Sequence, residues 1–497
     1  MKRYDAIVVG SGASGLSLAL LLGMNGHKVL LLEKNPYIGG GLFRFYRQGV
    51  PFDTGFHFTG GLNDGGLLNN MLKVLEINDD IQPDFLSGKH NQFIVEDEGC
   101  AYNLPPGIQD LSDKIKEYFP CEKEAVTKYF DMVRDVCLNT VTMDLRTISL
   151  TADSLDEDYV SLDNVLRRLT DNVSLRALLS GYVMCHGVRP TEISFANHSR
   201  ICFNLYESVA RIKDGGDAFI RSFRERFKTV DVDILCDRYI TECADVKNSR
   251  VGRFVLNSGE EVSCDNCILT IHPKEILKIL PRQYLTKAFI NRISAFESSA
   301  GFFSIFGTAG TVDIAGESEP GICCLFPVPD VDKLFDPHYK GKPALAVLKH
   351  YEMVKGKLLR VVTAFEPSFP GQVEDWADSK LGKRPAEYRE YKKQRTELIR
   401  NRILELYPEY QDPFQILDSA SSLTFRDYLH SPDGSAYGIK QKIGQYNLFG
   451  KLPLHNMYAA GQSSVLPGFL GAMTSSFIIA RSIVGKERYN NFIRQRL

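Results

Sequence analysis

The feature that most constrains this chain is a glycine-rich run, GSGASG at 10–15, that directly follows an apolar segment. Tyr4–Val9 is apolar without alternation, which predicts a strand buried on both faces. Ala13–Asn25 is rich in leucine and alanine and predicts a helix that Gly26 terminates. Lys28–Leu32 predicts a second strand. The start of the chain therefore predicts a β-α-β unit, whose parallel strands need a right-handed crossover.

The glycines of this turn have the spacing of a dinucleotide-binding motif. Gly10 permits the tight turn, Gly12 lets backbone N–H groups approach a pyrophosphate, and Gly15 lets the helix pack close to the strand. The first helical residues, Ala13 and Ser14, lie at a helix N-terminus, which offers unpaired N–H groups and positive partial charge to phosphates. A strand before the turn and a helix after it are the context that this motif requires.

An acidic residue and a second glycine cluster complete the N-terminal pattern. Glu33 lies 23 residues after Gly10, at the end of the second predicted strand, where a carboxylate accepts hydrogen bonds from ribose hydroxyls and repels a 2′-phosphate. Lys34 follows and is assigned to the same binding segment. The second cluster consists of Gly39, Gly40 and Gly41. A flavin needs close backbone contact beyond its pyrophosphate and a nicotinamide does not, so the pattern favours FAD.

Composition narrows the class of protein. A chain of 497 residues has room for two or three domains and for a core that needs no disulfides. The net charge of −2 argues against nucleic acid as a partner. No apolar run reaches the roughly 20 residues of a membrane span, and no signal-peptide cleavage pattern follows the first apolar run. We therefore expect a cytoplasmic protein, and no metal-ligand pattern stands out.

The rest of the chain predicts interleaved domains. Residues 65–207 have mostly helical patterns, several strand-like runs between 298 and 363 indicate a second sheet, and 386–406 predicts a charged, solvent-facing helix. The domain that binds the dinucleotide is expected to comprise residues 1–80, 208–275 and 425–497. The substrate domain is expected to comprise residues 81–207 and 276–424.

Five segments together resemble the FAD-dependent phytoene desaturase group, which includes carotenoid isomerases and retinol saturases, within the amine-oxidase-like flavoproteins. The segments are GSGASG through GGG (10–41), FDTGFHF (52–58), IKDGGDAFIRSF (212–223), SGEEVSCDNCILTI (258–271) and YAAGQSSVLPGFLGAMTSS (458–476). The resemblance implies an α/β fold in which a Rossmann-like FAD-binding domain of the glutathione-reductase type is interleaved with a mixed α+β substrate domain.

The resemblance also implies further cofactor contacts. Ile240 stands where the group uses backbone to meet adenine. The flavin contacts implied for the C-terminal segment are Gly461, Gln462, Gly468, Gly471 and Ala472. Two positions depart from many amine-oxidase-like proteins: Gly41 replaces an arginine and Gln462 replaces an acidic residue. These departures favour the polyene branch over amine oxidation.

The function implied is an FAD-dependent oxidoreductase that acts on a lipophilic unsaturated or polyene substrate, carotenoid- or retinoid-like, by hydride transfer at flavin N5. Desaturation, saturation and isomerisation share these motifs and stay open. The electron partner, a quinone, O2 or NAD(P)H, stays open too, as does peripheral contact with a membrane. The alternatives are an amine-oxidase-like or other flavin oxidase and a non-catalytic FAD-fold binding protein.

His57, in FDTGFHF, is the candidate polar group near the flavin ring. One interpretation makes it a proton donor or a hydrogen-bond partner of flavin or substrate. The other makes it a histidine that ties the loop to backbone, and both stay open. Asp53 is expected to brace the same loop, whereas Arg44 and Arg47 are expected in solvent rather than beside a flavin phosphate.

Overall fold

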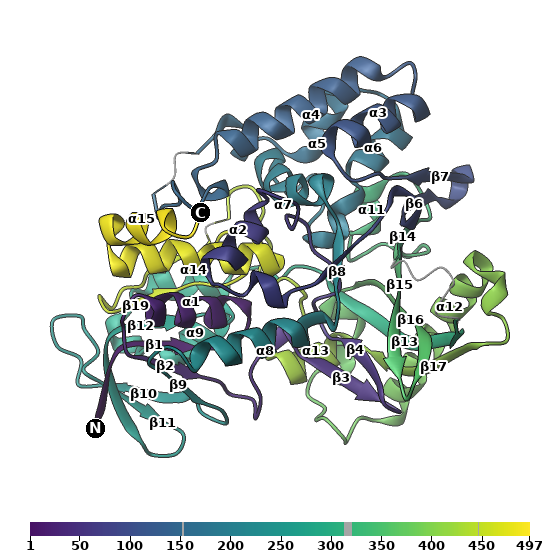
Figure 1. Cartoon of the computed structure of the whole chain (residues 1–497). Coiled ribbons are helices and arrows are strands. Elements are labelled where there is room, and N and C mark those ends of the chain that lie inside the picture. Colours follow the sequence, from purple (N-terminus) through teal and green to yellow (C-terminus); the bar gives the residue numbers. More distant parts are fainter. Residues whose placement is uncertain (152–153, 313–320, 446) are drawn as a thin grey trace.

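The computed structural model describes residues 1–151, 154–312, 321–445 and 447–497, and two large sheets organise it (Figure 1). The first sheet has a core of five parallel strands. In spatial order they are β9 (Val232–Leu235), β2 (Val29–Leu32), β1 (Lys2–Val9), β12 (Glu261–Leu269) and β19 (Met457–Ala459). Residues Ala6–Val8 of β1 and all of β2 are fully buried, as the unbroken apolar runs predict.

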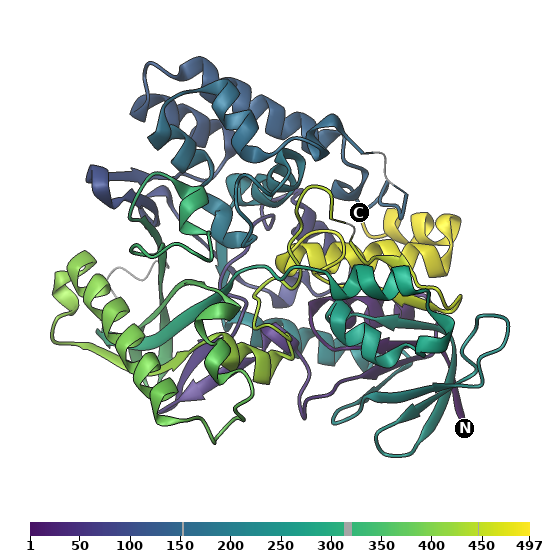
Figure 2. The ribbon, with the colours of Figure 1, turned by 180° about the vertical axis from the view of Figure 1, so that it is seen from behind.

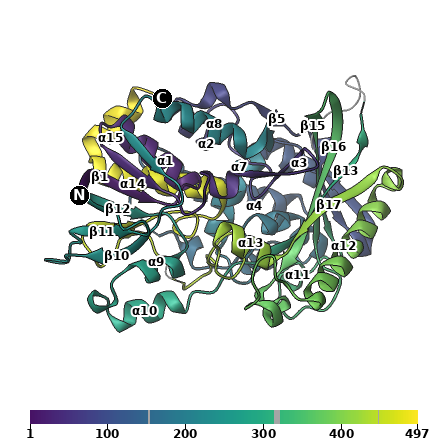
Figure 3. The same ribbon diagram turned by 90° about the horizontal axis from the view of Figure 1, so that it is seen from below.

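Short antiparallel strands extend this first sheet. Beside the first half of β12 lie β11 (Arg253–Leu256) and β10 (Ile240–Ala244), and β18 (Gly450–Lys451) pairs with β19. One face of the sheet packs against α1 (Ala13–Met24), α2 (Leu67–Val74), α8 (Gly215–Phe227), α14 (Gly468–Val484) and α15 (Lys486–Arg494). The other face packs against α9 (Pro273–Ile279) and α10 (Lys287–Ser294). Figure 3 shows α8 and α10 on opposite sides of these strands.

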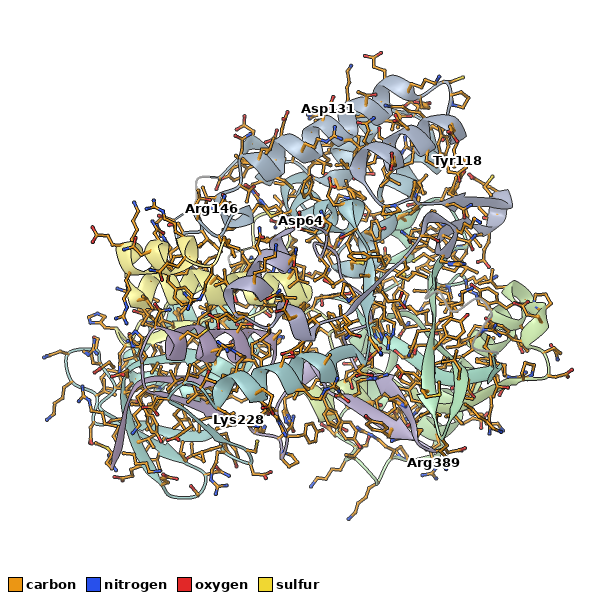
Figure 4. All side chains as sticks on the ribbon, in the orientation of Figure 1. Asp64, Tyr118, Asp131, Arg146, Lys228 and Arg389 are labelled. Atoms are coloured by element: carbon orange, nitrogen blue, oxygen red, sulfur yellow. The ribbon has the colours of Figure 1, made fainter. Side chains whose placement is uncertain are left out.

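The second sheet has longer, mostly antiparallel strands. Their spatial order is β17 (Phe414–Ala420), β13 (Gly301–Thr311), β16 (Lys357–Ser368), β15 (Leu345–Val354), β14 (Gly321–Phe326), β6 (Asn91–Val95) and β7 (Cys100–Asn103). One face packs on α12 (Ala386–Leu406), which buries Ile399 and Ile403 against it and leaves charged residues such as Arg389 pointing outward (Figure 4). The predicted charged helix therefore has one apolar side.

A helical layer lies above the opposite face of the second sheet (Figures 1 and 2). It consists of α3 (Ile108–Tyr118), α4 (Lys123–Leu138), α5 (Leu162–Leu169), α6 (Val173–Leu179) and α7 (Phe195–Glu207). These helices share one apolar core with residues of the second sheet such as Phe326 and Ala346. Within the described ranges, every helix is too short or too polar to cross a lipid bilayer.

Each sheet draws its strands from separate parts of the chain. Residues 2–32, 232–269 and 450–459 supply the first sheet, and residues 91–103 and 301–420 supply the second. We propose that the two interleaved domains expected from the sequence are organised around these two sheets.

Gly15 allows α1 to leave β1 at close range. A Cβ atom at this position would lie 1.8 Å from the carbonyl oxygen of Gly10 and 3.1 Å from the Thr270 hydroxyl. Any side chain here must therefore push the helix away from the strand that precedes it. The glycine is required by packing, as the motif predicts.

We predict that Gly15→Ala lowers the free energy of unfolding by about 3 kcal/mol, because the added methyl overlaps backbone that has little freedom to move. Urea denaturation followed by circular dichroism measures the change. Gly371→Ala is the matched control, since no heavy atom lies within 4 Å of the added carbon there. Equal stability of the two variants would contradict the packing role of Gly15.

Candidate cofactor and substrate site

The glycine turn forms an open cradle at the end of β1. Gly10 has φ +98°, and its N–H donates a hydrogen bond to the Leu32 carbonyl at 2.8 Å. At Gly12 an added Cβ would have no heavy atom within 4 Å. The space above Gly12 is therefore free, whereas the space beside Gly15 is filled.

The helix that follows this turn begins without a side-chain cap. Gly12 is its N-cap, and Ala13 and Ser14 are its first residues. The first N–H groups of a helix have no partner within the helix, so those of α1 are available to a ligand in the cradle. The Ser14 hydroxyl points elsewhere, because it is hydrogen-bonded to Ser476 of α14 at 2.8 Å.

Glu33 is held beside the cradle at the end of β2. Its side chain is buried, and its carboxylate accepts hydrogen bonds from the Ser11 N–H at 2.9 Å, the Ser11 hydroxyl at 2.5 Å and the Asn35 N–H at 2.8 Å. Lys34 is exposed, with its ammonium 5.8 Å from the ring centroid of Tyr239. Ile240 is the residue after Tyr239; it is buried and begins β10. The segment expected to meet ribose and adenine is thus assembled around Glu33.

The second glycine cluster packs directly on the first. The Gly39 N–H donates to the Ser11 carbonyl at 3.1 Å, and a Cβ at Gly40 would lie 3.0 Å from the Gly12 Cα. At Gly41 an added Cβ would have no heavy atom within 4 Å. The Gly41 carbonyl accepts a hydrogen bond from the Gly55 N–H at 3.0 Å. Gly12 and Gly41 therefore both leave open space beside the backbone, and Gly41 is hydrogen-bonded to the loop that carries His57.

The C-terminal segment is held against α1 by hydrogen bonds. Gly461 has φ +111° and donates its N–H to the Ser475 hydroxyl at 2.9 Å. The Ser475 hydroxyl also lies 3.3 Å from that of Ser14, which ties the segment to α1. The Gln462 side-chain amide donates a hydrogen bond to the Ala436 carbonyl at 3.4 Å, which an ionised acidic residue at this position could not do.

The helix α14 begins beside the cavity described below. Pro467 is its N-cap and provides no side-chain hydrogen bond, and Gly468, with φ +77°, is its first residue. A Cβ at Gly471 would lie 2.0 Å from the Leu466 carbonyl, so Gly471 is required by packing. Ala472 is buried one position further along. The N-terminal N–H groups of this second uncapped helix are available to the same ligand.

A cavity of about 210 Å³ lies between the second sheet, α7 and the loop that carries His57. Its lining comes from the loop 54–60, the start of α14, α7 and the second sheet. Phe302 and Phe365 face it from adjacent strands, whereas Phe303 faces α12. Its lining is mostly apolar and, among the described residues, includes no lysine, arginine, aspartate or glutamate.

His57 lines this cavity. Its ring stacks on Phe365 with 5.4 Å between the centroids, and its carbonyl accepts a hydrogen bond from Arg211 at 3.3 Å. Removal from water lowers the pKa of His57 to about 4; Arg211 adds to this effect and Asp53 opposes it. The imidazole is therefore neutral at physiological pH and presents one donor and one acceptor nitrogen.

A buried cluster of charges supports the His57 loop. Asp53 pairs with Arg211 and, at 3.1 Å, with Arg44; Glu352 pairs with Arg44, with Arg211 at 3.3 Å and with His350 at 3.3 Å. We call these five residues the Asp53 cluster. It joins the β3–β4 hairpin (Arg44–Arg47 and Val50–Asp53) to β8 (Ala210–Ile212) and β15.

The Asp53 cluster corrects the expectation for Arg44, which is 2% exposed rather than in solvent. Two buried carboxylates balance its charge and that of Arg211. Arg47 is partly exposed as expected and pairs with Asp418 at 2.5 Å. Burial raises the pKa of Asp53, but Arg211 and Arg44 outweigh that effect and lower the pKa to about 2.

The glycine pair of IKDGGDAF makes room for this cluster. Gly215 has φ +53°, and a Cβ there would lie 2.1 Å from a carboxylate oxygen of Asp53. At Gly216 the added carbon would lie 1.9 Å from the Leu42 carbonyl. The pair therefore allows α8 to begin against the Asp53 cluster and the second glycine cluster.

Sequence reasoning missed Arg211 and Glu352, because neither lies in a motif and both come from strands far along the chain. The structure places His350 in the Asp53 cluster and leaves Lys349 outside the cavity lining, 5.9 Å from the Tyr407 ring. Cys185 lines the cavity.

Family models recognise the N-terminal part of the chain. The model of the NAD(P)-binding Rossmann-like domain matches residues 8–75. This range contains the glycine turn, Glu33, the second glycine cluster and His57.

Similarity to characterised proteins extends over nearly the whole chain. An all-trans-retinol 13,14-reductase of Danio rerio is 27% identical over 98% of this chain and 86% of the relative. A protein of the same organism, named an inactive all-trans-retinol 13,14-reductase, is 22% identical over 97% of this chain and 86% of the relative. A chloroplastic prolycopene isomerase of an Oncidium hybrid cultivar is 29% identical, over 30% of this chain and 25% of the relative.

Solved structures confirm the predicted fold class, a Rossmann-like domain combined with a mixed-sheet domain. An oxidoreductase from Methanosarcina mazei superposes with a TM-score of 0.66 and 12% identity over 95% of this chain and 98% of that one. Cyclohexylamine oxidase from Brevibacterium oxydans IH-35A superposes with a TM-score of 0.60 and 14% identity over 99% of each chain. At such identities the likeness concerns the fold alone.

Asp53→Asn should lower the free energy of unfolding by about 3–5 kcal/mol at pH 7, because it leaves two buried guanidinium groups with one carboxylate. The depressed pKa of Asp53 gives stability above about pH 4 that is lost as the pH falls toward 2. The difference in free energy of unfolding between wild type and variant should therefore become smaller as the pH falls through that range. Urea denaturation at several pH values measures it.

Asp265→Asn is the control for that experiment. Asp265 pairs with Arg3 at 2.8 Å, and both side chains are largely exposed. Exposed pairs contribute about 0–1 kcal/mol, so this variant should unfold almost as wild type does. Equal losses for the two variants would show that the Asp53 cluster contributes no more than a surface pair.

Proposed function

We propose that this chain is an FAD-dependent oxidoreductase of lipophilic, unsaturated substrates. The chain is a distant homologue, over nearly its whole length, in the retinol saturase and prolycopene isomerase-like family. That family lies within the amine-oxidase-like superfamily of Rossmann dinucleotide-binding proteins. The substrate class proposed is a polyene of carotenoid or retinoid type. Relatives named for retinol reduction and for prolycopene isomerisation support this class.

One observation carries the proposal: the first glycine turn and the second glycine cluster pack on each other beside the buried Glu33 carboxylate. At Gly12 and Gly41 an added carbon would have no heavy-atom neighbour within 4 Å. Such openings at glycine suit a ligand that touches backbone. The residues present therefore fit the diphosphate and ribose of FAD.

The chain's own groups have separable roles in holding this cofactor. The N–H groups at the start of α1 would bind the diphosphate, and Glu33 would accept hydrogen bonds from ribose hydroxyls. The start of α14 directs a positive helix end toward the cavity, which favours negative charge near Gly468. Bound FAD would supply hydride transfer at its N5 to or from a substrate carbon.

The cavity favours a polyene over an amine. Among the residues that the structure describes, no carboxylate lines it, so an ammonium group would lose its hydration without gaining a counter-ion. Aromatic side chains such as Phe302, Phe365 and Phe469 instead offer apolar surface to a conjugated chain. His57, neutral and at the wall, would exchange a proton or a hydrogen bond with the reacting part of the molecule.

A non-catalytic FAD-fold binding protein is the second candidate, because one full-length relative is named as inactive. Both candidates bind FAD, so redox behaviour separates them. A yellow protein that bleaches with dithionite, reoxidises and converts a polyene is an enzyme. A protein that holds FAD and a lipid without product formation is a binding protein.

Gly12→Ala tests the cofactor cradle. The variant should fold with the stability of the unliganded wild type, because the added methyl meets no protein atom. Its dissociation constant for FAD should rise about tenfold to a hundredfold, because the methyl occupies space needed by the diphosphate. Flavin fluorescence titration of the deflavinated protein measures this. A variant that binds FAD with wild-type affinity would rule out diphosphate binding in the glycine cradle.

His57→Ala should lower turnover of a polyene about a hundredfold or more, the usual effect of a lost proton-transfer group. Since the pKa of His57 is lowered to about 4, the wild-type rate should show no titration of this residue between pH 6 and 8. The control is His338→Ala, at an exposed position outside the cavity. Full turnover by His57→Ala would favour the structural interpretation of this histidine.

A further inference from the structure

One tyrosine in the cavity wall accepts a hydrogen bond there. Tyr182 lies in the short 3-10 helix η7 (Gly181–Cys185) and lines the cavity. Its side chain is partly exposed, although the residues on either side of it are buried. The Tyr182 hydroxyl oxygen accepts a hydrogen bond from the side-chain amide of Asn91 at 3.1 Å. Asn91 lines the cavity too, so this bond joins two side chains of the wall.

The direction of this hydrogen bond leaves the tyrosine proton available. The Asn91 side-chain nitrogen also donates to the Leu104 carbonyl at 3.3 Å, which fixes the end of the amide that is the nitrogen. Because this nitrogen carries only donors, Asn91 cannot take the proton of Tyr182 through it. A hydroxyl has one proton to donate as well as its acceptor sites. Among the described residues, no acceptor is hydrogen-bonded to the Tyr182 proton.

Other groups of the lining that can act as acids are less suited to give up a proton. The Tyr437 hydroxyl already donates to a backbone carbonyl at 2.9 Å. Burial raises the pKa of the Cys185 and Cys324 thiols. Within the described ranges, neither sulfur accepts an N–H hydrogen bond that would stabilise a thiolate. Tyr182 differs, because the Asn91 N–H stabilises the phenolate that remains after the proton leaves.

The protonation states of Tyr182 and His57 are complementary. Burial raises the pKa of Tyr182 and the Asn91 hydrogen bond opposes this rise, so the phenol keeps its proton at neutral pH. The pKa of His57 is about 4, so at pH 7 only about one His57 in a thousand carries a second proton. The neutral imidazole can accept a proton, whereas the phenol is the group that has one to give.

Tyr182 and the start of α14 lie on different walls of the cavity. Phe56 and Phe469 line it and pack on the core of the first sheet. Tyr182 instead packs on the core shared by the helical layer and the second sheet. Figures 1 and 3 show α14 and the second sheet on opposite sides of α7. An occupant of the cavity therefore lies between Gly468 and Tyr182.

We propose that Tyr182 donates the proton when a carbon–carbon double bond of the substrate is reduced. One carbon of the double bond receives the hydride that reduced FAD supplies, and the other receives the Tyr182 proton. The substrate is thereby reduced, FAD is oxidised, and the phenolate of Tyr182 accepts the Asn91 N–H until water returns a proton to it. This inference rests on the proposed function for FAD and for an unsaturated substrate. It adds the acid, which that function leaves unassigned.

Tyr182→Phe removes the proton and keeps the ring. The flavin-loaded protein is reduced by light under argon and mixed with retinol, and the return of the absorption of oxidised flavin gives the rate. This rate should fall about a hundredfold or more in the variant. The FAD content, the melting temperature and the partition of retinol from detergent micelles should equal those of wild type. Reoxidation of the flavin at the wild-type rate would overturn the proposal.

Tyr118→Phe is the matched control. The Tyr118 hydroxyl also accepts an N–H hydrogen bond, from the backbone of Asn103 at 3.0 Å, but it lies on α3 outside the lining. This variant should reoxidise its flavin at the wild-type rate. Equal slowing in the two variants would overturn the proposal, because it would assign the effect to the loss of any such hydroxyl.

A second measurement needs no turnover. Carbon-13 NMR is recorded on oxidised protein in which the ring carbon that bears the tyrosine hydroxyl is labelled, and the resonances absent from the Tyr182→Phe and Tyr118→Phe spectra assign the two residues. The probe is β-ionone, a lipophilic ketone, at one bound molecule per protein. The Tyr182 resonance should shift as its hydroxyl donates to the ketone, and the Tyr118 resonance should not. An unmoved Tyr182 resonance would overturn the proposal.

A structural role for Tyr182 has a different signature. It would lower the melting temperature or the FAD content of Tyr182→Phe, and either result would overturn the proposal. Failure of the proposed function would instead appear in the wild type, as absence of bound FAD or as reduced flavin that no polyene reoxidises. The NMR measurement of Tyr182 would still report whether its hydroxyl meets a ligand in the cavity.

Discussion

The close approach of two glycine segments at the end of β1 is the contact on which the site depends. A Cβ added at Gly40 would lie 3.0 Å from the Gly12 Cα, and Gly39 is hydrogen-bonded to Ser11. Only residues without side chains allow this approach and still leave space above the backbone. Gly41 in turn accepts a hydrogen bond from Gly55 in the loop of His57. The proposed cofactor site and the position of that loop both depend on this contact.

The Asp53 cluster supports the loop that carries His57. Its charges come from three parts of the chain that meet between the two sheets. Ion pairs buried this deeply add little net stability, but breaking one leaves an uncompensated charge. The cluster therefore fixes the position of the loop more than it stabilises the fold. A neutral histidine on a fixed loop and an apolar wall opposite it define the chemical character of the cavity.

The sequence was informative where local rules determine the structure. The β-α-β unit, the roles of Gly10 and Gly15 and the resemblance to retinol saturases and carotenoid isomerases were predicted correctly, because strand burial and glycine spacing act over short distances. The burial of Arg44 could not be predicted, since its partner Glu352 lies 308 residues away.

A crystal structure of the FAD-loaded protein would locate the cofactor. We expect diphosphate density within hydrogen-bonding distance of the N–H groups of Ala13 and Ser14, ribose hydroxyls at Glu33 and the flavin ring between Gly41 and the cavity. Density for FAD elsewhere, or a glycine turn that faces a side chain or solvent while the cofactor is bound, would contradict it.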